Sequence, residues 1–142
     1  MPVAARSTRC QESRRGYARL VTERTPADHF GAQSVGFETF QRVYAAVAQT
    51  HPDVTVRISK SQVALRRRRG FAYLWSPGRY LRRPTAPVVL SIATTERLPS
   101  PRFKEVVHPG PWMHHLEIHA ADDIDDEVVG WLNSAADEAG EQ

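Results

Sequence analysis

The fold is decided in the middle of the chain, at residues Ser59–Trp75, where the sequence is SKSQVALRRRRGFAYLW. Four consecutive arginines, Arg66–Arg69, separate two segments in which apolar and polar residues alternate as they do in β-strands. The second segment carries three aromatic residues, Phe71, Tyr73 and Trp75, at alternate positions. The stretch therefore predicts a β-hairpin with a basic turn, and the position of its aromatic row depends on the turn.

The length of the turn decides which face of the sheet carries the aromatic residues. With a two-residue turn they would share a face with Ala64, an exposed arrangement that could stack unpaired bases. With a three-residue loop, Arg68-Arg69-Gly70, Leu65 would face Tyr73 and the aromatic residues would be core. Such a loop needs a left-handed residue at its third position, where Gly70 stands, whereas a two-residue turn would force a positive φ on an arginine. These preferences favour core aromatic residues.

The flanking sequence predicts an α+β fold. Apolar residues at helical spacing indicate a helix over Phe37–Val47 that ends before Pro52, because proline disfavours helix at the residue before it. The remaining expected elements are strands at Val54–Ser59, Ala86–Thr94, Phe103–Val107 and Trp112–His119, and a helix from Asp122 that stops at Gly140. Strands in a block between helices predict an antiparallel sheet of five to six strands with an N-terminal and a C-terminal helix packed on one face. Residues 34–142 are expected to form this single domain, and residues 1–33, which show no sustained period, a loosely ordered N-terminal arm.

Charge is distributed unevenly along the chain. The net charge is +3, but residues 52–104 hold 12 lysines and arginines against 2 acidic residues, whereas residues 105–142 hold no basic residue and 10 acidic ones. This asymmetry permits a surface that binds polyanions. It equally permits an acidic helix that packs beside a basic sheet, so that the two largely neutralise each other.

Composition limits the class of protein. The 142 residues suit one domain, and no apolar run approaches the roughly 20 residues that a membrane span requires. The N-terminus has no apolar stretch behind its charges, so we expect no secretory signal and a cytoplasmic location in a bacterium. The single cysteine, Cys10, can form neither an internal disulfide nor a cysteine-rich zinc site.

The first functional hypothesis is a non-enzymatic binding module for an anionic partner, with nucleic acid the favoured partner. The sequence contains no Gly-x-Ser-x-Gly, no glycine-rich phosphate loop and no paired-carboxylate signature, so no catalytic residue and no cofactor are predicted. The candidate polyanion-binding residues are Arg57, Arg66, Arg67, Arg68, Arg69, Arg79, Arg82 and Arg83.

The second hypothesis is a pocket protein or small enzyme that acts on an anionic small molecule around Lys60, Trp112 and His114. Lys60 continues the inward alternation of the strand before it, so it would either extend its ammonium to solvent or lie in a pocket with a lowered pKa. His114 would be either a pocket residue or a buried, hydrogen-bonded side chain. No metal site is expected, because His115 and His119 on one strand would be roughly 13 Å apart.

Four segments together resemble a bacterial family known as domain of unknown function 5655. They are Thr25–Phe30 (TPADHF), the arginine hairpin, Trp112–Leu116 (WMHHL) and Asp122–Ala135 (DDIDDEVVGWLNSA), and the resemblance covers about residues 25–140. Members show a similar lysine-bearing strand, a basic hairpin and a closing helix with an acidic start. Some members carry upstream cysteine pairs that look zinc-binding, whereas this chain has only Cys10 there. The resemblance implies the fold, and it implies no activity.

Overall fold

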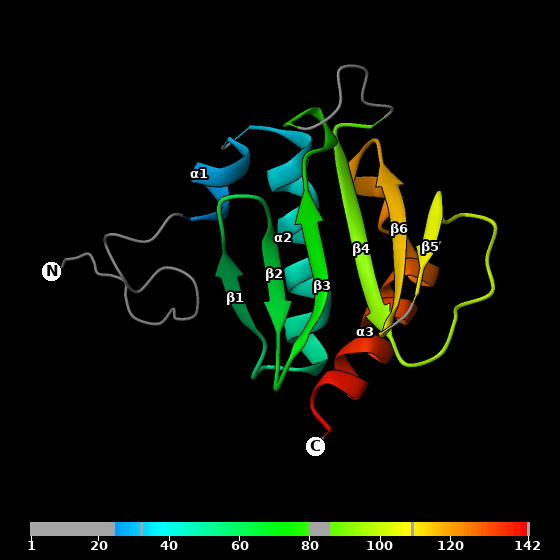
Figure 1. The fold of residues 1–142 in the computed structure, drawn as a ribbon. Helices are drawn as coiled ribbons and strands as arrows, with labels where there is room; N and C mark the ends of the chain where they lie inside the picture. Colours follow the sequence, from blue (N-terminus) through cyan, green and yellow to red (C-terminus); the bar gives the residue numbers. More distant parts are fainter. Residues whose placement is uncertain (1–24, 32, 80–85, 109, 142) are drawn as a thin grey trace, which may run out of the picture.

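The computed structural model describes residues 25–31, 33–79, 86–108 and 110–141 (Figure 1). Its helices are α1 (Pro26–Phe30), α2 (Val35–Thr50) and α3 (Asp126–Ala139), with 3₁₀ turns at Pro77–Arg79 and Ala121–Asp123. Its strands are β1 (Thr55–Ile58), β2 (Val63–Arg66), β3 (Gly70–Trp75), β4 (Val88–Thr94), β5 (Glu105–Val107) and β6 (Trp112–Ile118). The strands form one six-stranded sheet in the order β1-β2-β3-β4-β6-β5, and each neighbouring pair is antiparallel.

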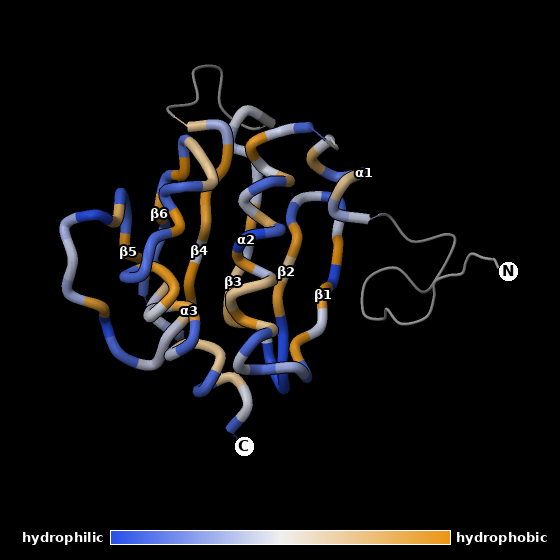
Figure 2. Tube along the Cα trace, turned by 180° about the vertical axis from the view of Figure 1, so that it is seen from behind, coloured by the Kyte–Doolittle hydropathy of each residue, from blue (hydrophilic) through white to orange (hydrophobic). Residues whose placement is uncertain are grey.

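Helices α2 and α3 lie against one face of the sheet and leave the other face uncovered (Figure 1). Apolar side chains from both helices meet the inward residues of β2, β3, β4 and β6, and this layer is the hydrophobic core. Figure 2 shows hydrophobic residues along these helices and strands. The predicted α+β fold, with two helices on one face of an antiparallel sheet, is therefore confirmed. Helix α1 falls within the stretch expected to be loose, whereas residues 1–24 lie outside the described part of the chain, so the predicted domain division stays a prediction.

Both long helices begin at a side-chain cap. The hydroxyl of Ser34 accepts a hydrogen bond from the backbone N–H of Phe37, and the carboxylate of Asp125 accepts one from Val128. Helix α2 ends at Thr50, two residues before Pro52, because proline disfavours the helical conformation at the residue before it. Local sequence therefore sets the helix boundaries, and apolar burial sets their positions on the sheet.

A β-bulge in β3 corrects the predicted hairpin. The loop does have three residues, but they are Arg67–Arg69, and Arg66 pairs with Gly70. The register then shifts, so that Leu65 pairs with Ala72 and not with Tyr73. The extra residue between these pairs is Phe71.

The bulge divides the aromatic row between the two faces of the sheet. Phe71 is 1% exposed in the core, next to Ala72, whereas Tyr73 and Trp75 lie half-buried on the uncovered face. Two consecutive side chains on one side of a strand are what a bulge produces. The prediction that all three aromatic residues are core was wrong for Tyr73 and Trp75. Gly70 is not left-handed as expected; a Cβ there would collide with the Tyr73 hydroxyl, which lies over it.

The arginine turn caps the C-terminal end of α3. The last carbonyls of a helix lack partners within the helix, and α3 has no basic residue in its own last turn. Arg67 Nη1 donates to the carbonyl of Ala136 at 2.7 Å, and its Nε donates to both carboxylate oxygens of Asp53 at 3.1 Å. The backbone N–H groups of Arg68 and Arg69 donate to the carbonyl of Ala139. Part of the arginine run therefore stabilises the fold.

A second arginine forms ion pairs with the acidic start of the same helix. Arg102 Nη1 lies 3.1 Å from Asp125 and 2.7 Å from Glu127, and its guanidinium lies over the ring of Trp131. The basic middle and the acidic end of the chain thus neutralise each other in part at the start of α3, whereas at its end Arg67 meets backbone carbonyls and Asp53.

Removing the Phe71 ring should destabilise the protein far more than removing the Tyr73 ring. Phe71→Ala leaves a core cavity and should lower the free energy of unfolding by about 3–5 kcal/mol. Tyr73→Ala, on the uncovered face, should cost less than about 2 kcal/mol. Urea unfolding followed by circular dichroism measures both, and equal costs would contradict the bulge.

Arg67 and Arg68 should differ although they are adjacent and both basic. Arg67→Gln removes the guanidinium that joins Asp53 to α3 and should cost about 2 kcal/mol, because hydrogen bonds to charged groups are stronger than neutral ones. Arg68→Gln keeps its backbone hydrogen bond to α3 and should stay within about 0.5 kcal/mol of wild type. The same unfolding measurement tests this pair, and a reversed order would show that Arg67 does not cap α3.

Candidate functional site

The uncovered face of the sheet carries a row of directly paired residues that crosses all six strands. Cross-strand partners on one face have closely spaced side chains, so such a row forms a continuous strip. The row runs Arg57, Ala64, Tyr73, Ser91, His115 and Glu105, from β1 to β5. It is basic at the β1 edge and acidic at the β5 edge, with aromatic and hydroxyl groups between them.

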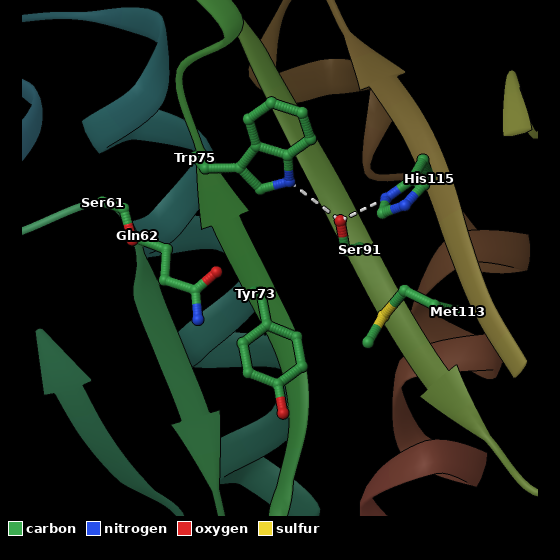
Figure 3. A pocket seen from close by; sticks show the side chains of 7 residues that line it. All are labelled: Ser61, Gln62, Tyr73, Trp75, Ser91, Met113 and His115. Carbon is green, nitrogen blue, oxygen red and sulfur yellow. Dashed lines mark hydrogen bonds between the residues drawn. The ribbon is translucent and has the colours of Figure 1, made fainter. Parts of the chain in front are cut away.

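A shallow pocket of about 460 Å³ lies over this row. It is lined by Ser61, Gln62, Tyr73, Trp75, Ser91, Met113 and His115 (Figure 3). Aromatic walls with a few polar groups are typical of small-ligand sites, and the volume lies within their usual range. Ser91 is only 3% exposed. Because the taller side chains of β3 and β6 stand on both sides of it, Ser91 forms the floor of the pocket.

A hydrogen-bonded chain links Trp75, Ser91 and His115 across three strands (Figure 3). The indole Nε1–H of Trp75 donates to Ser91 Oγ at 2.9 Å, and Ser91 Oγ lies 2.7 Å from His115 Nδ1. The indole can only donate, and a hydroxyl has one proton to give. We infer that the Ser91 hydroxyl donates to Nδ1, because the imidazole is then the acceptor for its proton; the ring is neutral and carries its own proton on Nε2. The His115 ring also meets the Trp75 ring edge-on, 6.1 Å between centroids.

Burial lowers the pKa of His115. Removal of the ring from water is the largest cause, and the neighbouring His114 lowers the pKa further, whereas the carboxylate of Glu105 acts in the opposite direction. The neutral ring inferred from the hydrogen bonds is therefore also the form that its surroundings favour.

Two of the candidate arginines lie on the uncovered face. Arg57 is exposed on β1, and Arg66 is half-buried at the end of β2, on the same side of the sheet as Tyr73. On the opposite edge, Lys104 lies 3.3 Å from Glu117. Among the described residues, the positive charge of this face is therefore concentrated at β1 and β2.

The other candidate arginines are at the hairpin tip or outside the described residues. Arg67 is occupied with Asp53 and α3, whereas Arg68 and Arg69 are exposed at the tip. The side chain of Arg79 and residues 80–85, which include Arg82 and Arg83, lie outside the described part of the structure.

The three residues of the predicted small-molecule pocket are not brought together. Lys60 is exposed in the turn between β1 and β2, because the inward alternation of β1 ends at Ile58. His114 is fully buried in the core. Trp112 starts β6, where it stacks on His108 at 4.2 Å between centroids.

His114 has both ring nitrogens bonded. Its Nε2 accepts from the backbone N–H of Leu98 at 2.9 Å, so its Nδ1–H donates to the carbonyl of Ile92 at 3.0 Å. His114 is thus a buried, hydrogen-bonded side chain, the second of the two roles that the sequence left open, and it has no proton or lone pair left for a ligand.

Sequence reasoning missed Ser91 and His115 as a pair. Ser91 stands in a continuous apolar segment, and His115 follows His114, which shares the apolar side of its strand. The alternation of β6 does place His115 opposite His114, on the polar side, and this was the available signal. The contact itself depends on the pairing of β4 with β6, which the sequence does not show.

Within residues 25–31, 33–79, 86–108 and 110–141, no group of three or more His, Cys, Asp or Glu side chains could hold a metal ion. In the same part of the chain, no helix combines the length and the apolar character needed to cross a membrane.

The lowered pKa of His115 predicts a pH dependence of stability. As the pH falls, the unfolded state takes up the proton on His115 before the folded state does. The neutral ring's contribution to stability is therefore complete above the ordinary histidine range. It is lost as the pH falls through that range toward the lower pKa of the folded state. His115→Gln removes the titration. The difference in free energy of unfolding between wild type and this variant should therefore shrink between about pH 8 and about pH 5. Urea titrations at each pH measure it, and a constant or growing difference would contradict the assignment.

Comparison with known proteins supports the resemblance seen in the sequence. No curated protein and no solved structure matches the chain. The model of one family, described as Domain of unknown function (DUF5655), matches residues 27–138, which include every strand of the sheet and nearly all of α3. The chain therefore belongs to the DUF5655 family.

Proposed function

We propose that the uncovered face of the sheet binds single-stranded nucleic acid. The observation that carries the proposal is the outward position of Tyr73 and Trp75 on the sheet face that no helix of the described residues covers. Antiparallel sheets with outward aromatic residues stack the bases of unpaired strands in several classes of RNA-binding module. Such stacking contributes about 1–3 kcal/mol per base and tolerates any base sequence.

The charges near these rings suit a phosphate backbone. Arg57 shares the cross-strand row of Tyr73 two strands away, and Arg66 extends the same face toward the hairpin tip. Arg68 and Arg69 continue the positive charge at the tip itself. A strand whose bases lie on Tyr73 could thus run along the β1–β2 side of the sheet, away from Glu105 and Glu117.

The cap on α3 limits which arginines this proposal uses. The guanidinium of Arg67 is already hydrogen-bonded to Asp53 and to the carbonyl of Ala136. It therefore contributes to binding through its positive electrostatic potential and not through a new contact. Arg79, Arg82 and Arg83 stay candidates from the sequence. The proposal also places the protein in the bacterial cytoplasm, where single-stranded nucleic acid is available.

The alternative, a small anionic ligand held around Lys60 and His114, has less support. His114 is buried with both nitrogens bonded, and Lys60 lies in an exposed turn. A small-ligand function would have to use the pocket of Trp75, Ser91 and His115 instead.

Binding should depend on the aromatic rings and on Arg57. In anisotropy titrations with labelled DNA or RNA of about 12 nucleotides, Trp75→Leu should lose about 1–3 kcal/mol of binding free energy. Trp75→Phe, which keeps a stacking ring, should lose much less. Arg57→Gln should weaken binding and lower the slope of log affinity against log salt by about 1 between about 50 mM and about 200 mM salt.

Arg42→Gln is the matched control. Arg42 carries the same charge on α2, on the covered side of the sheet, where it pairs with Asp122. It should leave the affinity nearly unchanged. Failure of the wild-type protein to bind either kind of single strand at low salt would refute the proposal, and equal losses in Arg42→Gln and Arg57→Gln would show that the uncovered face is not the site.

A further inference from the structure

We propose that Ser91 is a nucleophile and His115 its general base, in a site that transfers acyl groups from activated esters with an aromatic part. This activity goes beyond nucleic-acid binding and does not depend on it. The residues lie on β4 and β6, face each other directly in the register, and meet in the pocket of the uncovered face.

The geometry meets the first requirement for nucleophilic catalysis. A serine and its base must lie within hydrogen-bond distance, about 2.6–3.2 Å, and Ser91 Oγ lies 2.7 Å from His115 Nδ1. In the arrangement inferred above, the hydroxyl proton points to the imidazole, and the Trp75 indole donates its own proton to the same oxygen.

Trp75 supplies a second element. Its Nε1–H lies 2.9 Å from Ser91 Oγ, and a donor in this position favours the negative charge that develops on the oxygen as its proton leaves. Ser91 is thus held between a donor that favours the alkoxide and a base that takes the proton. The same contacts fix its rotamer at the floor of the pocket.

The charged and titratable groups around His115 suit a base. Burial keeps the ring neutral near pH 7, because it lowers the pKa of His115, and His114 on the same strand acts in that direction. Glu105, the partner of His115 on β5, favours the charged ring that forms when the proton arrives. Glu105, His115 and Ser91 are thus direct cross-strand neighbours on β5, β6 and β4, and the carboxylate acts on the ring through its charge.

Acyl transfer would take place in two steps, in which Ser91 and His115 exchange the protons. Ser91 Oγ forms a bond to the acyl carbon while its proton passes to His115 Nδ1. The bond to the leaving alcohol or phenol then breaks, and that oxygen takes the proton from Nδ1. Water, activated by the same ring, later cleaves the acyl–serine ester and regenerates the hydroxyl.

The lining of the pocket indicates the substrate class. Trp75 and Tyr73 offer aromatic walls, and Met113 adds an adaptable apolar surface (Figure 3). Gln62, the residue before β2, lines the same pocket, and its amide is a side-chain donor of the kind that stabilises an oxyanion. An ester of a flat aromatic acid or phenol fits these groups.

A fluorophosphonate probe tests the nucleophile directly. Attack by an activated serine forms a phosphorus–oxygen bond and expels fluoride, leaving a stable adduct whose position peptide mass spectrometry can identify. The wild-type protein should be labelled at Ser91 and at no other serine. Ser91→Ala should abolish the adduct, whereas Ser134→Ala, the same change on an exposed position of α3, should leave it unchanged.

His115 is tested by rate. His115→Gln should slow labelling at least about 100-fold, because a general base contributes that much or more. In the wild type the rate should rise with pH and level off below the ordinary histidine range, a profile that a purely structural histidine would not give. Absence of an adduct on Ser91 in the folded wild-type protein, labelling spread over several serines, or a rate unchanged in His115→Gln would each overturn the proposal. Because the probe carries no nucleic acid, its result does not depend on whether the sheet binds single strands.

Discussion

The β-bulge at Phe71 turns two consecutive side chains of β3, Phe71 and Ala72, toward the helices. Every later residue of the strand is thereby displaced by one step relative to a regular hairpin, so Leu74 enters the core and Tyr73 and Trp75 face outward. The Trp75 indole therefore lies on the uncovered face, where it donates to Ser91, and Ser91 is in turn hydrogen-bonded to His115 on β6. Without the extra residue the two rings would belong to the core, and the pocket would lose its aromatic walls. Packing of one phenyl ring therefore decides the chemistry of the opposite face.

The bulge stands beside a turn that is held in place from outside the sheet. Arg67 and the two backbone N–H groups after it bind the last carbonyls of α3, and Asp53, in the turn before β1, binds the same guanidinium. A turn of four like charges is thus stabilised by the negative end of a helix and by one carboxylate. The contacts of Arg67 separate the arginine that supports the fold from Arg57, Arg66, Arg68 and Arg69, the arginines that the proposed binding uses.

Much of the fold could be predicted from the sequence, because its signals are local. The apolar spacing of α2, the proline after it, the acidic start of α3 and the alternation of β1 and β6 each reflect contacts within a few residues. The bulge could not be predicted, since both turn lengths satisfy the local alternation and the burial of Phe71 depends on helices far along the chain. The cap of α3 by Arg67 joins residues 69 positions apart. The pair Ser91 and His115 depends on β4 lying next to β6 and not next to β5, a choice that no local pattern records.

Both proposed functions require the uncovered face with Trp75 to be the surface that meets a ligand. Nuclear magnetic resonance tests this requirement most directly, because each tryptophan gives its own indole N–H signal. The three tryptophans occupy different places: Trp75 is on the uncovered face, Trp112 starts β6, and Trp131 on α3 packs against Arg102. During titration with a short single-stranded oligonucleotide, we expect the Trp75 indole signal to shift together with the amides of β2, β3 and β4, while the Trp131 signal stays in place. Shifts confined to the surroundings of Trp131, or a Trp75 signal that does not move at saturation, would contradict it.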